Sequence, residues 1–90
     1  MSATHLVVFP TPTEPDALAH RVRRLQVEAR SLAREHVELL AAALTDVSRL
    51  SAEIADGGEV YPVGARELSR RLIEESGMAA LTLTAIVDRT

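Results

Sequence analysis

The chain has 90 residues, a formal charge of −3 at pH 7 and a hydrophobic fraction of 47%. A chain of this length forms one domain at most, and this hydrophobic fraction is typical of folded proteins rather than disordered ones. Cysteine is absent, which excludes disulfides and thiolate zinc sites, and the net charge gives no overall attraction to nucleic acid or anionic membranes. All ten basic residues are arginine, a bias typical of GC-rich bacterial genomes.

No apolar run in the sequence approaches the roughly 20 residues that a membrane-spanning helix needs. The N-terminal end also lacks the basic segment and the long apolar run of a secretory signal peptide. We therefore expect a cytoplasmic protein that does not associate with a membrane.

The first segment of the chain is rich in proline. Pro10, Pro12 and Pro15 fall within six residues, after a short apolar run at residues 6–9. Proline lacks a backbone N–H and disfavours regular structure in the residue before it. The sequence therefore predicts a flexible or extended N-terminal arm at residues 1–13, followed by a helical domain at residues 14–90.

The following stretch predicts one long helix. From Asp16 to Asp56 there is no glycine or further proline, and Gly57-Gly58 then provides an end signal. The apolar residues repeat at alternating spacings of four and three, which is the heptad pattern. One such stripe contains Leu18, Val22, Leu25, Ala29, Leu32, His36, Leu39 and Ala43. A second, overlapping stripe contains Ala33, Val37, Leu40, Leu44, Val47, Ser51 and Ile54.

A second helix is predicted after the turn. Pro62 suits a first helical position, and apolar residues recur at helical spacing from Ala65 to Ile86. Ser76-Gly77 is a weak point that would kink the helix or split off a short third one, but we favour a continuous helix. Because the connection is short, the two helices should be antiparallel. The expected fold is an all-α helical hairpin of two unequal helices.

The unequal lengths have a consequence for assembly. A second helix of about 28 residues covers only about 28 residues of the first. Leu18, Val22 and Leu25 then lack a helix within the chain to bury them, so either the N-terminal arm or another chain covers them. We expect a homodimer that forms a four-helix bundle, with parallel and antiparallel arrangements both open. The predicted interface residues are Leu18, Val22, Leu25, Ala29, Leu32, His36, Leu39, Leu40 and Leu44.

The histidines do not indicate a metal site. His20 and His36 are sixteen residues apart, a rotation of about 160° around a helix, so they cannot bind the same metal ion. His36 falls at a core position of the first stripe, where we expect a partly buried, hydrogen-bonded side chain. A pH-sensitive interface or a phosphate-accepting histidine is the alternative interpretation.

No pattern of catalytic residues is present either. The acidic pair Glu35 and Glu38 lacks the Glu-x-x-His motif of di-iron bundles, and Gly57-Gly58 lacks the lysine of a phosphate-binding loop. We therefore expect no enzyme activity, no cofactor and no metal. The sequence predicts a small interaction or regulatory protein that binds a protein partner.

One group of charges stands out. The arginines of this group are Arg21, Arg23, Arg24, Arg30 and Arg34. Glu28 is the only acid between Arg21 and Arg34, whereas acids outnumber arginines in the rest of the first helix. Three interpretations are open: a solvated helix face, a nucleic-acid-binding segment, and pairing with the acidic half of an antiparallel neighbour. Because the net charge is negative and no helix-turn-helix spacing is present, nucleic acid is the alternative to a protein partner.

Overall fold

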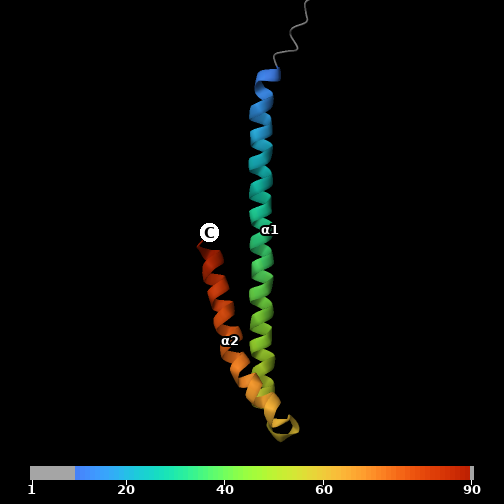
Figure 1. The fold of residues 1–90 in the computed structure, drawn as a ribbon, viewed down its shortest axis with the longest axis vertical. Helices are drawn as coiled ribbons and strands as arrows, with labels where there is room; N and C mark the ends of the chain where they lie inside the picture. Colours follow the sequence, from blue (N-terminus) through green and yellow to red (C-terminus); the bar gives the residue numbers. More distant parts are fainter. Residues whose placement is uncertain (1–9, 90) are drawn as a thin grey trace, which may run out of the picture. The chain divides into compact units, whose positions relative to one another are not determined.

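The computed structural model describes residues 10–89, with side chains from Pro15 onward, and it consists of helices joined by one turn (Figure 1). Helix α1 spans Pro10–Ala55, the 3-10 turn η2 spans Gly58–Val60, and helix α2 spans Val63–Asp88. The two long helices contain 46 and 26 residues, and residues 10–89 include no strand. The predicted all-α class is confirmed.

The chain divides into two compact units. Unit 1 ends at Ala33, and its described part is the N-terminal portion of α1. Unit 2 begins at Arg34 and contains the remainder of α1, the turn η2 and α2. Residues 1–9, which form most of the predicted arm, lie outside the described residues.

The start of α1 differs from the prediction. The helix begins at Pro10, so the prediction that residues 10–13 belong to a non-helical arm was wrong. The N–H groups of the first helical turn have no carbonyl partner, so Pro10 and Pro12 remove no hydrogen bond there. Pro15 lies in the second turn and removes one, which the good helix formers after it tolerate.

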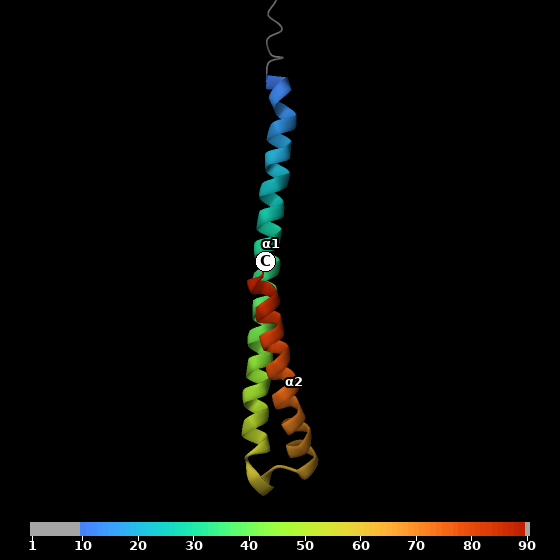
Figure 2. The same ribbon diagram turned by 90° about the vertical axis from the view of Figure 1, so that its left-hand side faces the viewer.

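Within unit 2, α1 and α2 lie side by side as an antiparallel hairpin (Figures 1 and 2). The hydroxyl of Ser48 donates to the carbonyl oxygen of Ile73 at 3.1 Å. Farther from the turn, the guanidinium of Arg34 lies 4.0 Å from the carboxylate of Asp88. Lower residue numbers on α1 thus meet higher numbers on α2, and the predicted hairpin is confirmed.

The turn between the helices depends on two glycines and a tyrosine. Gly58 has a φ of 83°, a backbone conformation that residues with a Cβ rarely adopt. The ring of Tyr61 lies against Gly57, where a Cβ would overlap it. The N–H of Tyr61 donates to the carbonyl of Gly58 at 3.1 Å, and Nε of Arg66 donates to the carbonyl of Tyr61 at 3.1 Å. Gly57 therefore leaves room for the ring of Tyr61, and Gly58 adopts the positive φ that the turn requires.

The helices of unit 2 meet through small side chains. The buried residues of the described chain are Ala41, Ser51, Ala55, Ser69, Ser76, Ala80 and Val87. All but one are alanine or serine, and we call this set the small-residue seam. Small side chains reduce the distance between packed helix axes. The bond from a side chain of α1 to the backbone of α2, between Ser48 and Ile73, is consistent with this close approach.

Helix α2 runs through Gly77 without interruption, as the sequence analysis favoured. A Cβ built on Gly77 would lie 3.6 Å from Oγ of Ser48, which is an ordinary van der Waals distance. Neither helix, over the residues described, has a stretch long and apolar enough to cross a bilayer.

Opposite effects are expected from alanine at two of the glycines. Gly77→Ala should raise the unfolding free energy by about 1 kcal/mol, because alanine favours a helix interior and its methyl group fits. Gly58→Ala should lower it by about 1–2 kcal/mol, because its φ is positive. Circular dichroism melts should show the melting temperature changing by about 4–8 °C per kcal/mol. If Gly77→Ala instead lowered the unfolding free energy, the helices would have to lie closer together at Gly77 than the 3.6 Å contact with Ser48 indicates.

The seam also predicts a contrast between adjacent alanines. Ala41 is 9% exposed on the seam, whereas its neighbour Ala42 is exposed. Ala41→Leu should force the helices apart and cost about 1–3 kcal/mol, whereas Ala42→Leu should change stability by less than about 0.5 kcal/mol. Chemical denaturation of both variants measures the difference, and equal effects would mean that Ala41 does not face α2.

Candidate interaction surfaces

The part of α1 in unit 1 exposes an apolar stripe. Leu18, Val22, Leu25 and Leu32, which the sequence places at an interface, are 52–64% exposed, and Ala29 is exposed as well. Their spacing of four, three and seven residues puts them on one helix face. This stripe, which we call the unit 1 stripe, is a surface available to another helix.

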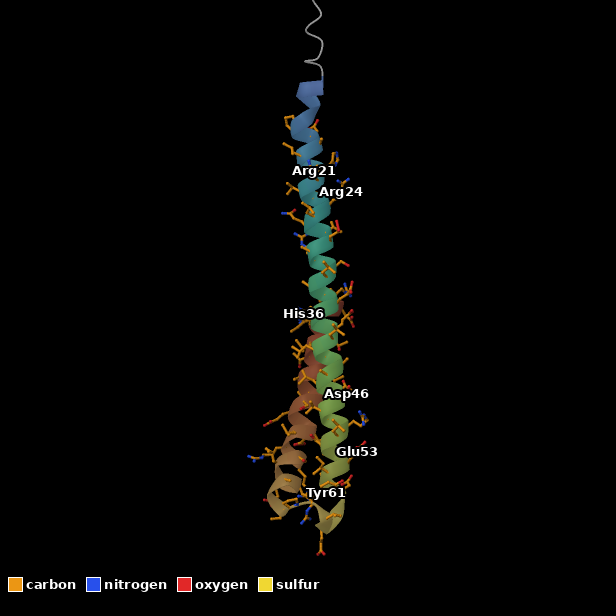
Figure 3. All side chains as sticks on the ribbon, turned by 90° about the vertical axis from the view of Figure 1, so that its right-hand side faces the viewer. Arg21, Arg24, His36, Asp46, Glu53 and Tyr61 are labelled. Carbon is orange, nitrogen blue, oxygen red and sulfur yellow. The ribbon has the colours of Figure 1, made fainter. Side chains whose placement is uncertain are left out.

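Within unit 2, the same heptad pattern also remains on the outside. Leu39 and Leu40 are 68% and 52% exposed, and Leu44 is half-buried. His36 is exposed, so the histidine is not a core residue of the hairpin (Figure 3). The expectation of a partly buried His36 is wrong for the single chain, because α2 packs against a different face of α1. Its place at an interface between chains stays a prediction.

The face of α1 that meets α2 is only partly the one that the sequence predicts. It shares the buried Ser51 with the second stripe, but it also includes Ala41, Ser48 and Ala55, which neither stripe contains. These three residues are spaced at intervals of seven, as are the buried Ser69 and Ser76 on α2. Small residues repeating every seven positions on both helices were the available signal. The larger side chains of the first stripe would keep two helices farther apart.

A shallow groove with a mainly apolar lining lies on the hairpin. It is lined by the apolar residues Leu40, Leu44, Met78, Ala79 and Leu83 and by Glu74, Glu75 and Thr82. Both glutamates are exposed, and neither has a cationic partner among the described side chains. We call this surface the acid-rimmed groove.

A second groove on the hairpin contains hydroxyl groups that already have partners. Thr45 donates to the carbonyl of Ala41 at 3.1 Å, and Thr84 donates to that of Ala80 at 2.9 Å. Ser48, also in this groove, donates to the backbone of α2. Because these hydroxyls bond within the chain, they do not mark a ligand site.

The arginine group divides between the two units. Arg21, Arg23, Arg24 and Arg30 lie in unit 1, are exposed, and have no carboxylate partner among the side chains from Pro15 to Arg89. Figure 3 shows Arg21 and Arg24 on this part of α1. Arg23 donates instead to Nδ1 of His20 at 3.2 Å. Arg34 belongs to unit 2, where it lies 3.7 Å from Glu38 and 4.0 Å from Asp88. Within this group, the four arginines of unit 1 therefore lack a carboxylate partner, whereas Arg34 has two.

Unit 2 is acidic. Its sequence contains ten acidic residues and six arginines, whereas unit 1 has four arginines and three acids. Arg49 pairs with Asp46 at 3.6 Å and with Glu53 at 3.1 Å, on the surface of α1. Exposed pairs of this kind contribute about 0–1 kcal/mol each. The uneven charge is therefore a property of the surface rather than a source of stability for the hairpin.

Neither a metal site in the described residues nor a similar protein indicates a function for this chain. The described residues include no group of three or more histidine, cysteine, aspartate or glutamate side chains placed to hold a metal ion. No protein-family model, no curated protein and no solved structure matches the chain. The exposed apolar surfaces and the charge distribution are the features from which a function is inferred.

Proposed function

We propose that the protein is a small non-enzymatic interaction or regulatory protein, which works as a homodimer and binds a protein partner through its helical faces. One observation supports this proposal above the others. The buried apolar core of the described residues consists of Ala41, Ala55, Ala80 and Val87, whereas most leucines are exposed. Small chains bury little surface even when compact, so a core of this size is marginal. Association would bury the remaining apolar surface.

The sizes of the free energies involved are compatible with dimerisation as a four-helix bundle. Burial of one leucine or valine contributes about 1.5–3 kcal/mol, so Leu18, Val22 and Leu25 from two chains contribute on the order of 10 kcal/mol. Association itself costs about 4–15 kcal/mol. Leu32 and Leu39 must then take part as well. Two hairpins supply the four helices, and apolar residues left outside, such as Leu81, are available to a partner protein.

Substitution of the exposed stripe should prevent association. Leu25→Gln/Leu32→Gln removes apolar burial at the interface, so we expect a monomer at concentrations where the unmodified chain has twice its mass of 9.7 kDa. Val60→Gln/Val63→Gln is a matched control, because both valines are exposed near the turn, and it should remain dimeric. Sedimentation equilibrium measures both. An unmodified chain that stays monomeric at every concentration would contradict the proposal.

The N-terminal arm provides a second test of the dimer. A chain that begins at Thr13 should associate as the full chain does, because the interface lies on the helices. A full chain that is monomeric, and that associates only when residues 1–12 are absent, would show that the arm covers the stripe. Light scattering of the two chains distinguishes these results.

Nucleic-acid binding by residues 21–34 is the alternative function. It is supported by the exposed arginines of unit 1, which lack carboxylate partners among the described side chains. Electrophoretic mobility at two salt concentrations tests it, because phosphate contacts make binding salt-dependent. A complex that is lost in Arg23→Ala/Arg24→Ala, and kept in the control Arg70→Ala/Arg71→Ala on α2, would favour this alternative. Absence of a complex at low salt would reject it.

A further inference from the structure

We propose that the acid-rimmed groove of unit 2 holds the unit 1 helix, residues 15–33, of a second copy of this chain, and that two copies dock these helices reciprocally. The inference rests on the homodimer proposed above and adds which surfaces meet. The proposed occupant of the groove is thus a segment of this same protein.

The first argument is the match between the apolar surfaces. A helix that binds in a groove inserts side chains spaced three, four and seven residues apart. Leu18, Val22 and Leu25 have this spacing, and all three are exposed. The lining of the groove includes Leu40 and Met78, which are 52% and 66% exposed. Each surface thus has exposed apolar side chains that contact with the other surface would bury.

The second argument is charge. Arg21 lies between Leu18 and Leu25 along one flank of the unit 1 stripe, because residues three and four apart are neighbours on a helix. Arg30 is nine residues away, a rotation of about 180° from Arg21, so it lies farther from the stripe, whereas Glu28 lies seven residues from Arg21 on the same flank. Both arginine side chains are exposed and unpaired among the described residues, as are Glu74 and Glu75 of the groove. Docking would therefore place opposite charges together.

The same charges oppose the alternative pairings. Contact between two grooves would bring Glu74 and Glu75 beside their own copies, and parallel contact between the unit 1 stripes of two chains would bring Arg21 beside Arg21. Juxtaposed like charges oppose association. Pairing of the stripe with the groove instead brings Arg21 toward Glu74 and Glu75.

Size and symmetry are compatible with this arrangement. The segment from Leu18 to Leu25 is about 10 Å long, and the part of α2 that lines the groove, from Glu74 to Leu83, is about 14 Å long. The groove is therefore long enough for the three apolar side chains of this segment, and the rest of the docked helix extends beyond it. If each copy both donates a helix and receives one, a twofold axis relates two identical contacts, and the assembly closes as a dimer.

Charge-swapped full-length chains test the proposal. One chain carries Glu74→Arg/Glu75→Arg, and the other carries Arg21→Glu/Arg30→Glu. Each alone places like charges at both contacts, so its dissociation constant should rise at least about tenfold. Mixed together, they place opposite charges at both contacts, and the dissociation constant should return to within about threefold of the unmodified dimer. Glutamate and arginine both favour helices, and circular dichroism checks that each chain folds.

A third chain controls for net charge. Glu59→Arg/Glu67→Arg makes the same change in charge as the groove variant but at exposed positions outside the groove. It should dimerise normally, and mixed with Arg21→Glu/Arg30→Glu it should form a weaker heterodimer than the groove variant does. Equal rescue by the third chain would overturn the inference, because net charge would then explain the association.

The results separate the two proposals. A dimer that is insensitive to the charge swaps overturns docking in the groove and leaves the homodimer standing. Folded swapped chains that stay monomeric in the mixture also overturn the inference. If the unmodified chain forms no dimer, the homodimer itself fails. Sedimentation velocity with one chain fluorescently labelled distinguishes these outcomes.

Discussion

The close packing of α1 against α2 in unit 2 is the constraint on which the remaining features depend. The helices meet along alanine and serine, and Ser48 reaches the backbone of the opposite helix at Ile73. No buried side-chain nitrogen or oxygen of the described residues lacks a hydrogen-bond partner. A seam of this kind sets the orientation of the helices closely. It removes little apolar area from water, however, so its hydrophobic contribution is modest.

Most of the large apolar side chains of the described residues stay exposed as a result. A seam made of small residues occupies one face of each helix, so leucines such as Leu39 and Leu81 remain on the others, at 68% and 70% exposure. Monomeric proteins rarely expose contiguous apolar patches of this kind, because such surfaces associate. The hairpin thus resembles part of a larger core, and this is the physical basis for proposing that it functions through association.

Charge adds direction to that association. The four arginines of unit 1 lack carboxylate partners among the described side chains, and the exposed glutamates of the groove belong to unit 2. Ion pairs within the chain, such as those of Arg49, lie on the surface and contribute little. In the proposed dimer, charges of opposite sign would favour contact between unit 1 of one chain and unit 2 of another, whereas apolar burial would supply most of the free energy.

The sequence alone determined the helices and the turn, because these depend on interactions between residues close in the chain. Glycine at 57 and 58 and Pro62 mark the turn, and the prediction failed only at the start of α1, where Pro10 removes no hydrogen bond. The tertiary structure decided which face of α1 meets α2. Two overlapping heptad stripes have the same period, so periodicity cannot choose between them or a third face. The choice of face depends on how closely the two helices can approach. The face that is chosen also places Arg34 beside Asp88 and leaves His36 exposed.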